Sequence, residues 1–142
     1  MNCRLFVITV LLLCTSLAKA QIVVIAHSEV VNDTITTTEL HDIYTGDMTF
    51  WKDGEPIIVC DLNDSTNTHD QFYAYIGVNS SRIKSIWMKR MLSGESDPPL
   101  IYQSGAELSQ HISELPGAIG FVDRQHISGK VKILLHIETP SE

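Results

Sequence analysis

The sequence predicts an α/β domain with a mainly parallel sheet and helices on both faces. Three observations lead to this fold class. Apolar runs rich in β-branched residues alternate along the chain with segments whose apolar residues recur at helical spacing. The apolar runs are continuous, which is typical of strands buried on both sides. Helix start and stop signals separate the two kinds of segment.

The first part of the domain is expected to form two strands with one helix between them. Residues 22–26, IVVIA, predict the first strand and residues 57–62 the second. Thr36-x-x-Glu39 is a capping box, in which each side chain satisfies a backbone N–H of the other residue. Apolar residues at helical spacing follow, and Gly46 is a typical helix stop.

Three further helices are expected, beginning near Thr68, Ser80 and Ser104. Thr68-x-x-Gln71 has the pattern of a capping box, so Thr68 is the predicted cap of its helix. The second of these helices cannot continue through Pro98-Pro99, because proline lacks the backbone donor and clashes with the preceding turn.

Two last strands are expected at residues 118–122 and 131–137. Strands and helices thus alternate from end to end, with no internal repeat and no linker. This pattern predicts one domain.

Residues 1–20 have the layout of a secretory signal peptide. A short apolar run is followed by Ala18-Lys19-Ala20, an A-x-A cleavage site. We therefore expect a mature domain of residues 21–142 that is periplasmic or secreted. Cys14 raises the alternative of a lipoprotein, but Leu13 before it is larger than the small residue such sites usually carry.

Composition excludes some classes of partner. Residues 1–20 hold two basic residues and no acid, so their removal takes the formal charge from −7 to −9. Nucleic-acid binding relies on clustered Lys and Arg, which this chain lacks. No second apolar run is long enough to span a membrane. Cys60 is the one cysteine left, so no intramolecular disulfide can form.

No sequence motif indicates catalysis, a metal or a cofactor. The six histidines show no H-E-x-x-H pattern, and each is expected to be a surface or capping residue. Cys60 lies in a predicted buried strand and is expected to fill space. The G-x-S-x-G elbow of hydrolases is absent. We expect a protein that is not an enzyme.

The stretch DLNDSTNTHDQF, residues 61–72, is the candidate binding segment. It joins the predicted second strand to the next helix, where a helix dipole and unpaired N–H groups favour an anion. The candidate ligand-binding residues form one continuous run: Asp64, Ser65, Thr66, Asn67 and Thr68. Short polar residues at a helix start are also common as plain caps, so ordinary capping remains the alternative.

Four segments resemble phosphate ABC-transporter substrate-binding proteins. They are ELHDIYTGDMTFWKDGEPI, DLNDSTNTHDQF, IWMKRMLSGESDPP and PGAIGFVD. The third is similar to a short, free-standing subgroup of that family. The resemblance implies a single lobe of a type II periplasmic binding-protein fold, with phosphate or a related oxyanion as ligand.

The resemblance also assigns roles within the candidate segment. Thr66 stands at the family's loop serine and Thr68 at its loop threonine. Asp64 stands at the aspartate that accepts a hydrogen bond from protonated phosphate.

Three positions depart from the family pattern. Leu62 stands where the phosphate binders keep an arginine, and Ser65 and Asn67 replace two glycines. The sequence is also about half the family's length, so we expect the facing lobe to be missing.

Two functions follow as expectations. The first is an exported, non-enzymatic solute-binding-like domain for a small oxyanion. The alternative is a ligand-free interaction module that docks on a partner in the cell envelope or associates with a second copy. Trp51 is expected at the edge of the core, with a lid or contact surface as the other interpretation.

Overall fold

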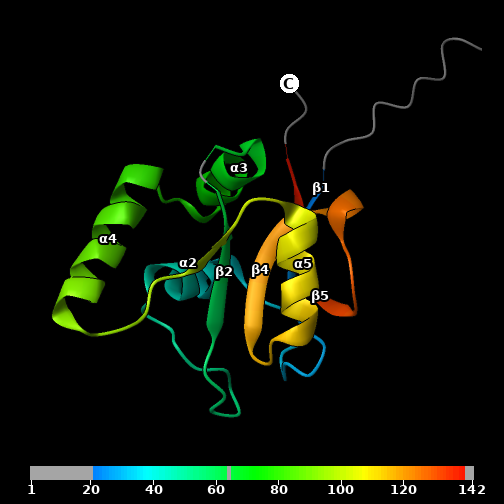
Figure 1. Ribbon diagram of the computed structural model, residues 1–142, viewed down its shortest axis with the longest axis horizontal. Helices are drawn as coiled ribbons and strands as arrows, with labels where there is room; N and C mark the ends of the chain where they lie inside the picture. Colours follow the sequence, from blue (N-terminus) through cyan, green and yellow to red (C-terminus); the bar gives the residue numbers. More distant parts are fainter. Residues whose placement is uncertain (1–20, 64, 140–142) are drawn as a thin grey trace, which may run out of the picture.

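The computed structural model describes residues 21–63 and 65–139, which form one sheet with helices on both faces (Figure 1). The predicted signal peptide, residues 1–20, lies outside the described residues. So do Asp64 and residues 140–142.

The described residues form a five-stranded sheet in the order β3-β2-β4-β1-β5. The strands are β1 (Gln21–His27), β2 (Ile58–Leu62), β3 (Leu100–Tyr102), β4 (Ala118–Asp123) and β5 (Val131–Glu138). β2 pairs in parallel with both β3 and β4, whereas β1 pairs antiparallel with both β4 and β5. Four strands therefore point the same way and β1 alone is reversed, which confirms the mainly parallel sheet.

Strand β1 is as buried as its apolar run predicts. Every residue from Ile22 to Ala26 is fully buried between two neighbouring strands. A continuous apolar run specifies burial on both faces but carries no information about strand direction, which the connections decide. The three-residue strand β3 was not predicted, because it follows Pro98-Pro99 directly and is too short to show a pattern.

The α-helices of the described chain are α2 (Thr37–Thr45), α3 (Asn67–Ile76), α4 (Ser80–Ser93) and α5 (Gly105–Glu114), and a short 3-10 helix spans Arg124–His126. Thr36 and Glu39 form both bonds of the predicted capping box. Gly46, Gly77 and Gly94 end their helices in the left-handed conformation. The predicted cap at Thr68 is wrong, because Thr66 is the N-cap of α3.

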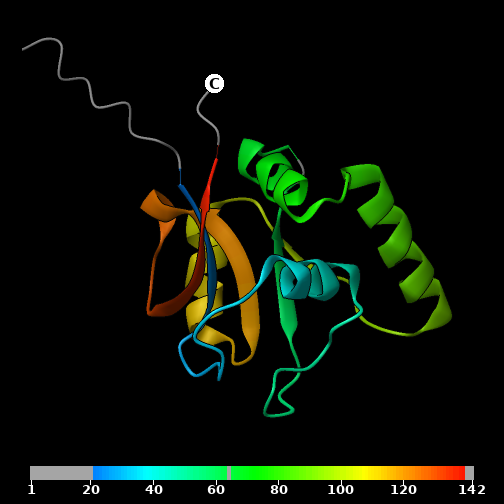
Figure 2. The ribbon, with the colours of Figure 1, turned by 180° about the vertical axis from the view of Figure 1, so that it is seen from behind.

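Helix α5 covers one face of the sheet, and α2 and α3 cover the other (Figures 1 and 2). Strand β4 shows both contacts. A Cβ added to Gly120 would lie 2.6 Å from Ile112 of α5, so glycine allows that helix to approach closely. The next residue, Phe121, stacks on Phe72 of α3 with ring centroids 3.9 Å apart. Successive residues of one strand thus build two core layers.

Trp51 belongs to the core. Its side chain is buried, and its Nε1–H donates to the Gly117 carbonyl at 3.0 Å. The lid interpretation of Trp51 is therefore wrong, and its neighbour Phe50 is the exposed aromatic residue. Cys60 is fully buried, as predicted.

Candidate functional site

The loop between β2 and α3 is held by a side-chain turn at Asn63. The Asn63 carboxamide oxygen accepts from the Ser65 N–H at 3.0 Å, and its amide nitrogen donates to Gln103 at 2.8 Å. The Asn63 N–H also donates to the Tyr102 carbonyl. The loop is thus fastened to the chain that follows β3, which fixes where α3 begins.

The Thr66 hydroxyl organises the start of α3. It accepts from the His69 N–H at 3.2 Å and donates to the Asn63 carbonyl at 2.9 Å. The first N–H groups of a helix have no acceptor within the helix, and the cap satisfies one of them. Thr66 therefore has a structural role whether or not a ligand binds.

The Thr68 hydroxyl turns toward the end of β4. It donates to a carboxylate oxygen of Asp123 at 3.2 Å. Thr66 and Thr68 thus bond to different parts of the protein. Ser65 and Asn67, which flank Thr66, are exposed. The described part of the predicted site therefore offers two solvent-facing side chains at the N-terminus of α3.

A buried polar group that the sequence did not reveal lies under this loop. Asp61, 6% exposed, accepts from the Tyr73 hydroxyl at 2.7 Å and from the Leu62 N–H at 2.8 Å. His69 Nε2 lies 3.9 Å from the same carboxylate. Burial, reinforced by the Asp61 charge, holds the pKa of Tyr73 well above its usual value. Tyr73 therefore stays a hydrogen-bond donor to Asp61.

His69 and His27 are both buried, which corrects the expectation that each histidine is a surface or capping residue. One signal was present in the sequence. His69 and Tyr73 are four residues apart and so share one face of α3, and that helix follows an aspartate at the end of a strand. In the structure this face of α3 turns both residues toward Asp61 at the end of β2.

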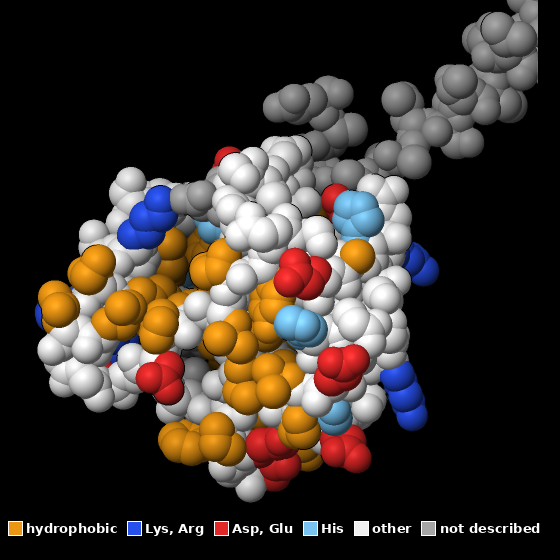
Figure 3. Space-filling view, in the orientation of Figure 1, with side chains coloured by type: hydrophobic (Ala, Val, Ile, Leu, Met, Phe, Trp, Pro, Cys, Tyr) orange, Lys and Arg blue, Asp and Glu red, His pale blue; other side chains and the backbone are white. Residues whose placement is uncertain are grey.

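A cavity of about 560 Å³ opens between α4 and the ends of β2 and β3. Its walls are mainly apolar and include Trp87 and Met91 of α4, with Pro98 and Ile101 opposite. Figure 3 shows the hollow, with hydrophobic side chains gathered beside it over α4.

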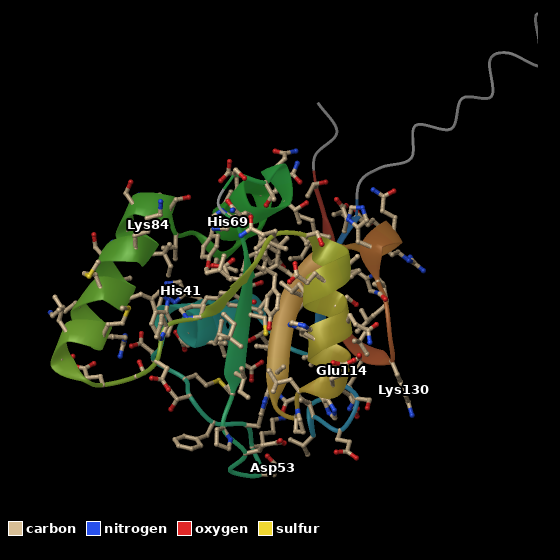
Figure 4. The ribbon with its side chains drawn as sticks, in the orientation of Figure 1. His41, Asp53, His69, Lys84, Glu114 and Lys130 are labelled. Atoms are coloured by element: carbon tan, nitrogen blue, oxygen red, sulfur yellow. The ribbon has the colours of Figure 1, made fainter. Side chains whose placement is uncertain are left out.

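Polar side chains gather at one end of the cavity. Asp61, Asn63 and His69 line it from the β2–α3 side, and Lys84 lines it from α4. Figure 4 labels Lys84 and His69 on the two sides of this end. The cavity is therefore apolar along its length and polar where it meets the β2–α3 loop.

The residues described here contain no group of three or more His, Cys, Asp or Glu side chains placed to hold a metal ion. Within the same residues, no helix has the length and apolar character needed to cross a bilayer.

Comparison with known proteins gives a match at the level of structure. No family model matches the chain, and no curated protein matches its sequence. Solved structures do match. A protein assigned as a phosphate ABC transporter substrate-binding protein, with bound phosphate, from Clostridium perfringens superposes with a TM-score of 0.67 at 21% identity. The chain has the fold of one lobe of such a binding protein.

Two further structures agree with this lobe assignment. An ABC-type phosphate transport receptor from Vibrio cholerae gives a TM-score of 0.63 and PstS from Borrelia burgdorferi gives 0.61, each at 18% identity. The matches cover 81% of this chain but only 45% to 47% of the three solved chains. The chain thus spans about half the length of the structures it resembles, and the expected single-lobe fold is confirmed.

Proposed function

We propose that this chain is an exported, non-enzymatic solute-binding-like domain that holds phosphate or a related oxyanion at the start of α3. One observation carries the proposal. The carboxyl end of β2 leads through a fastened loop directly into the N-terminus of α3. In open α/β sheets, ligands bind outside the carboxyl ends of the strands, and a helix N-terminus attracts anions.

The proposed ligand contacts come from residues 64–68. Ser65 and Asn67 are exposed and supply a hydroxyl and an amide donor without breaking any bond described above. Thr66 keeps the first turn in place by accepting from the His69 N–H, and the positive end of the α3 dipole attracts an anion. Thr68 joins when its hydroxyl exchanges Asp123 for the anion. Asp64, as the resemblance implies, accepts a hydrogen bond from a protonated oxygen of the ligand.

We expect the affinity for inorganic phosphate to be weak. Leu62 is buried and apolar at the position where the resemblance expects an arginine fork. Charge-assisted bidentate bonds are the strong contacts in oxyanion sites, and a single lobe leaves the ligand open to water. The dissociation constant should therefore be on the order of millimolar, about −4 kcal/mol of binding free energy.

The test is the thermal midpoint of purified residues 21–142 with phosphate, sulfate or chloride at equal ionic strength. A ligand that binds only the folded state raises the midpoint by mass action. We expect a rise with about 20 mM phosphate that Ser65→Ala and Asn67→Ala each reduce. Ser81→Ala, an exposed serine in the first turn of α4, is the matched control and should keep the full rise. No rise above that with chloride rejects the proposal.

A second function is favoured by the exposed apolar side chains on one side of the molecule. They are Phe50, Met88, Met91, Leu92, Leu100 and Ile101. Strand β3 is also an edge strand of the described sheet, and edge strands are sites where a further chain can pair. An interaction module that docks on an envelope protein or on a second copy would use this side. Sedimentation over a wide range of concentrations tests the second copy, because self-association raises the apparent mass with concentration.

Export rests on the signal layout of residues 1–20, and a periplasmic or secreted location follows from it. Mass spectrometry of the protein recovered from the periplasm or medium of an expressing cell should give a chain beginning at Gln21. A mass that retains the first twenty residues contradicts cleavage.

A further inference from the structure

We infer that the cavity between α4 and the ends of β2 and β3 binds the apolar tail of an organic oxyanion, such as a monoalkyl phosphate, whose head group lies at the start of α3. This inference rests on the proposed function and names the class of ligand that the same site would prefer.

The size and walls of the cavity fit a small apolar group. Its volume of about 560 Å³ falls within the usual range for small-molecule sites. Ile83, Trp87 and Met91 recur every four residues and therefore line the cavity from one face of α4. Pro98 and Ile101 form the opposite wall. Such a surface offers an inorganic anion neither hydrogen-bond donors nor charge.

The cavity borders the loop that carries the proposed oxyanion site. Asn63 and His69 both line the cavity, and each is hydrogen-bonded to a residue of the proposed site: Asn63 accepts from the Ser65 N–H and the His69 N–H donates to Thr66. Asn63 is also the residue that fastens the loop, through its bonds to Ser65 and Gln103. A head group at the first turn of α3 therefore places an attached chain at the polar end of the cavity.

The charges at this end favour an anionic head at the rim. Lys84 lines the cavity from the second turn of α4, and Ser80 begins that helix beside it. The positive end of the α4 dipole and the Lys84 ammonium thus act in the same direction. Asp61 opposes an anion, but it is buried and receives hydrogen bonds from Tyr73 and Leu62. The head group consequently belongs at the rim, and the tail runs toward Met91.

The outer wall of the cavity is suited to moving aside for a ligand. Met88 and Met91 are 57% and 47% exposed, so neither is locked in the core. Methionine side chains are flexible and adapt to apolar ligands of varied shape. Trp87, by contrast, is fixed, since its Nε1–H donates to the Tyr44 carbonyl at 2.9 Å. The cavity has a rigid floor and an adjustable outer wall.

The experiment compares inorganic phosphate, octyl phosphate and octanol by calorimetric titration into residues 21–142. Each buried methylene tightens binding by about fourfold, so octyl phosphate should bind at least about tenfold more tightly than phosphate. Met91→Gln should remove most of this gain and leave phosphate binding unchanged. Leu92→Gln is the matched control, because Leu92 is the neighbouring exposed residue of α4 and does not line the cavity.

Each outcome has one meaning, provided that circular dichroism shows the variants folded. Tight binding of octyl phosphate that Met91→Gln weakens, and Leu92→Gln does not, supports the inference. Equal affinity for phosphate and octyl phosphate overturns the inference and leaves the proposed function standing. Octanol binding as tightly as octyl phosphate overturns the role of the anionic head. Binding of none of the three rejects the inference and the proposed function together.

Discussion

The two ends of the sheet, taken along the strand order, are built differently. On one side, β1 lies between β4 and β5 with residues 22–26 fully buried. On the other, the described chain places only the short edge strand β3 and helix α4 beyond β2 (Figure 1). Of the fourteen residues of α4, only Ile83 and Trp87 are buried. We refer to the β1–β4–β5 part as the closed half and to β2, β3 and α4 as the open half.

The difference separates stability from binding. Burial of apolar surface is the main source of folding free energy, and the closed half supplies many more fully buried residues than the open half. The open half leaves apolar side chains in water, keeps a ligand-sized cavity and carries the start of α3 at its rim. Substitutions in the closed half should therefore cost folding, whereas those on the surface of the open half should change binding.

Phe121→Ala is the strongest test of this contrast. Phe121 stacks on Phe72 and contacts Tyr44, and no solvent reaches it. We expect a loss of about 3–5 kcal/mol in the free energy of unfolding, because the change leaves a cavity in the core. Ile101→Ala, at a residue 57% exposed, should cost less than about 0.5 kcal/mol. Urea unfolding followed by circular dichroism measures both, and equal losses would remove the distinction between the halves.

Tyr73→Phe tests the boundary between the halves. It deletes the hydroxyl that donates to the buried Asp61 at 2.7 Å. Removal of one partner of a buried hydrogen bond costs about 1–3 kcal/mol, and more when the other partner is charged. Tyr75→Phe is the control, since its hydroxyl bonds to Thr37 at an exposed site and its loss should cost less than about 1 kcal/mol. If the two variants unfold at the same urea concentration, the hydrogen bond from Tyr73 to Asp61 does not stabilise the fold.

The smallest effect is expected from Cys60 in alkaline solution. Burial raises the pKa of this thiol from 9.0 to about 12, while a hydrogen bond with Tyr102 acts in the opposite direction. A thiol whose pKa is raised by folding stays protonated while the unfolded chain ionises. The contribution of the protonated thiol to the free energy of unfolding is thus intact below pH 9. It is lost as the pH rises toward 12, by up to about 1.4 kcal/mol per pH unit.

Urea unfolding of residues 21–142 at pH 8 and pH 10 measures this loss, with Cys60→Ala as the control that should lessen it. Tyr44 and Tyr73, whose pKa values are also raised by burial, add a loss of the same sign. A thiol reagent at pH 8 should label Cys60 only as fast as β2 separates from its neighbouring elements and exposes the thiol. Rapid labelling of the native protein would mean that the elements around β2 do not exclude solvent from Cys60.

The sequence predicted a local feature well where one residue type could play only one structural role at its position. The Thr36–Glu39 capping box and the glycine stops at Gly46, Gly77 and Gly94 all appear in the structure. The shift of the α3 cap from Thr68 to Thr66 has a simple cause. Several adjacent residues in this loop can cap a helix, and the bonds of the Asn63 turn select one of them.

The candidate site was predicted only in outline. Residues 64–68 were identified because they join a strand to a helix, which is a local property. The Asp61–Tyr73–His69 group was missed, because its members belong to two elements whose packing brings them together. The cavity was missed for the same reason, since its walls come from α4, β2 and residues 98–101.

By itself, the sequence determined the α-helices and every strand of the described chain except β3, and it determined which strands are buried, because periodicity and capping act over a few residues. Tertiary structure alone decided that β1 runs against its neighbours, that the Thr66 and Thr68 hydroxyls take separate partners, and that α4 stands away from β2 to leave a cavity. These features depend on contacts between residues far apart in the chain, and no local pattern records such contacts.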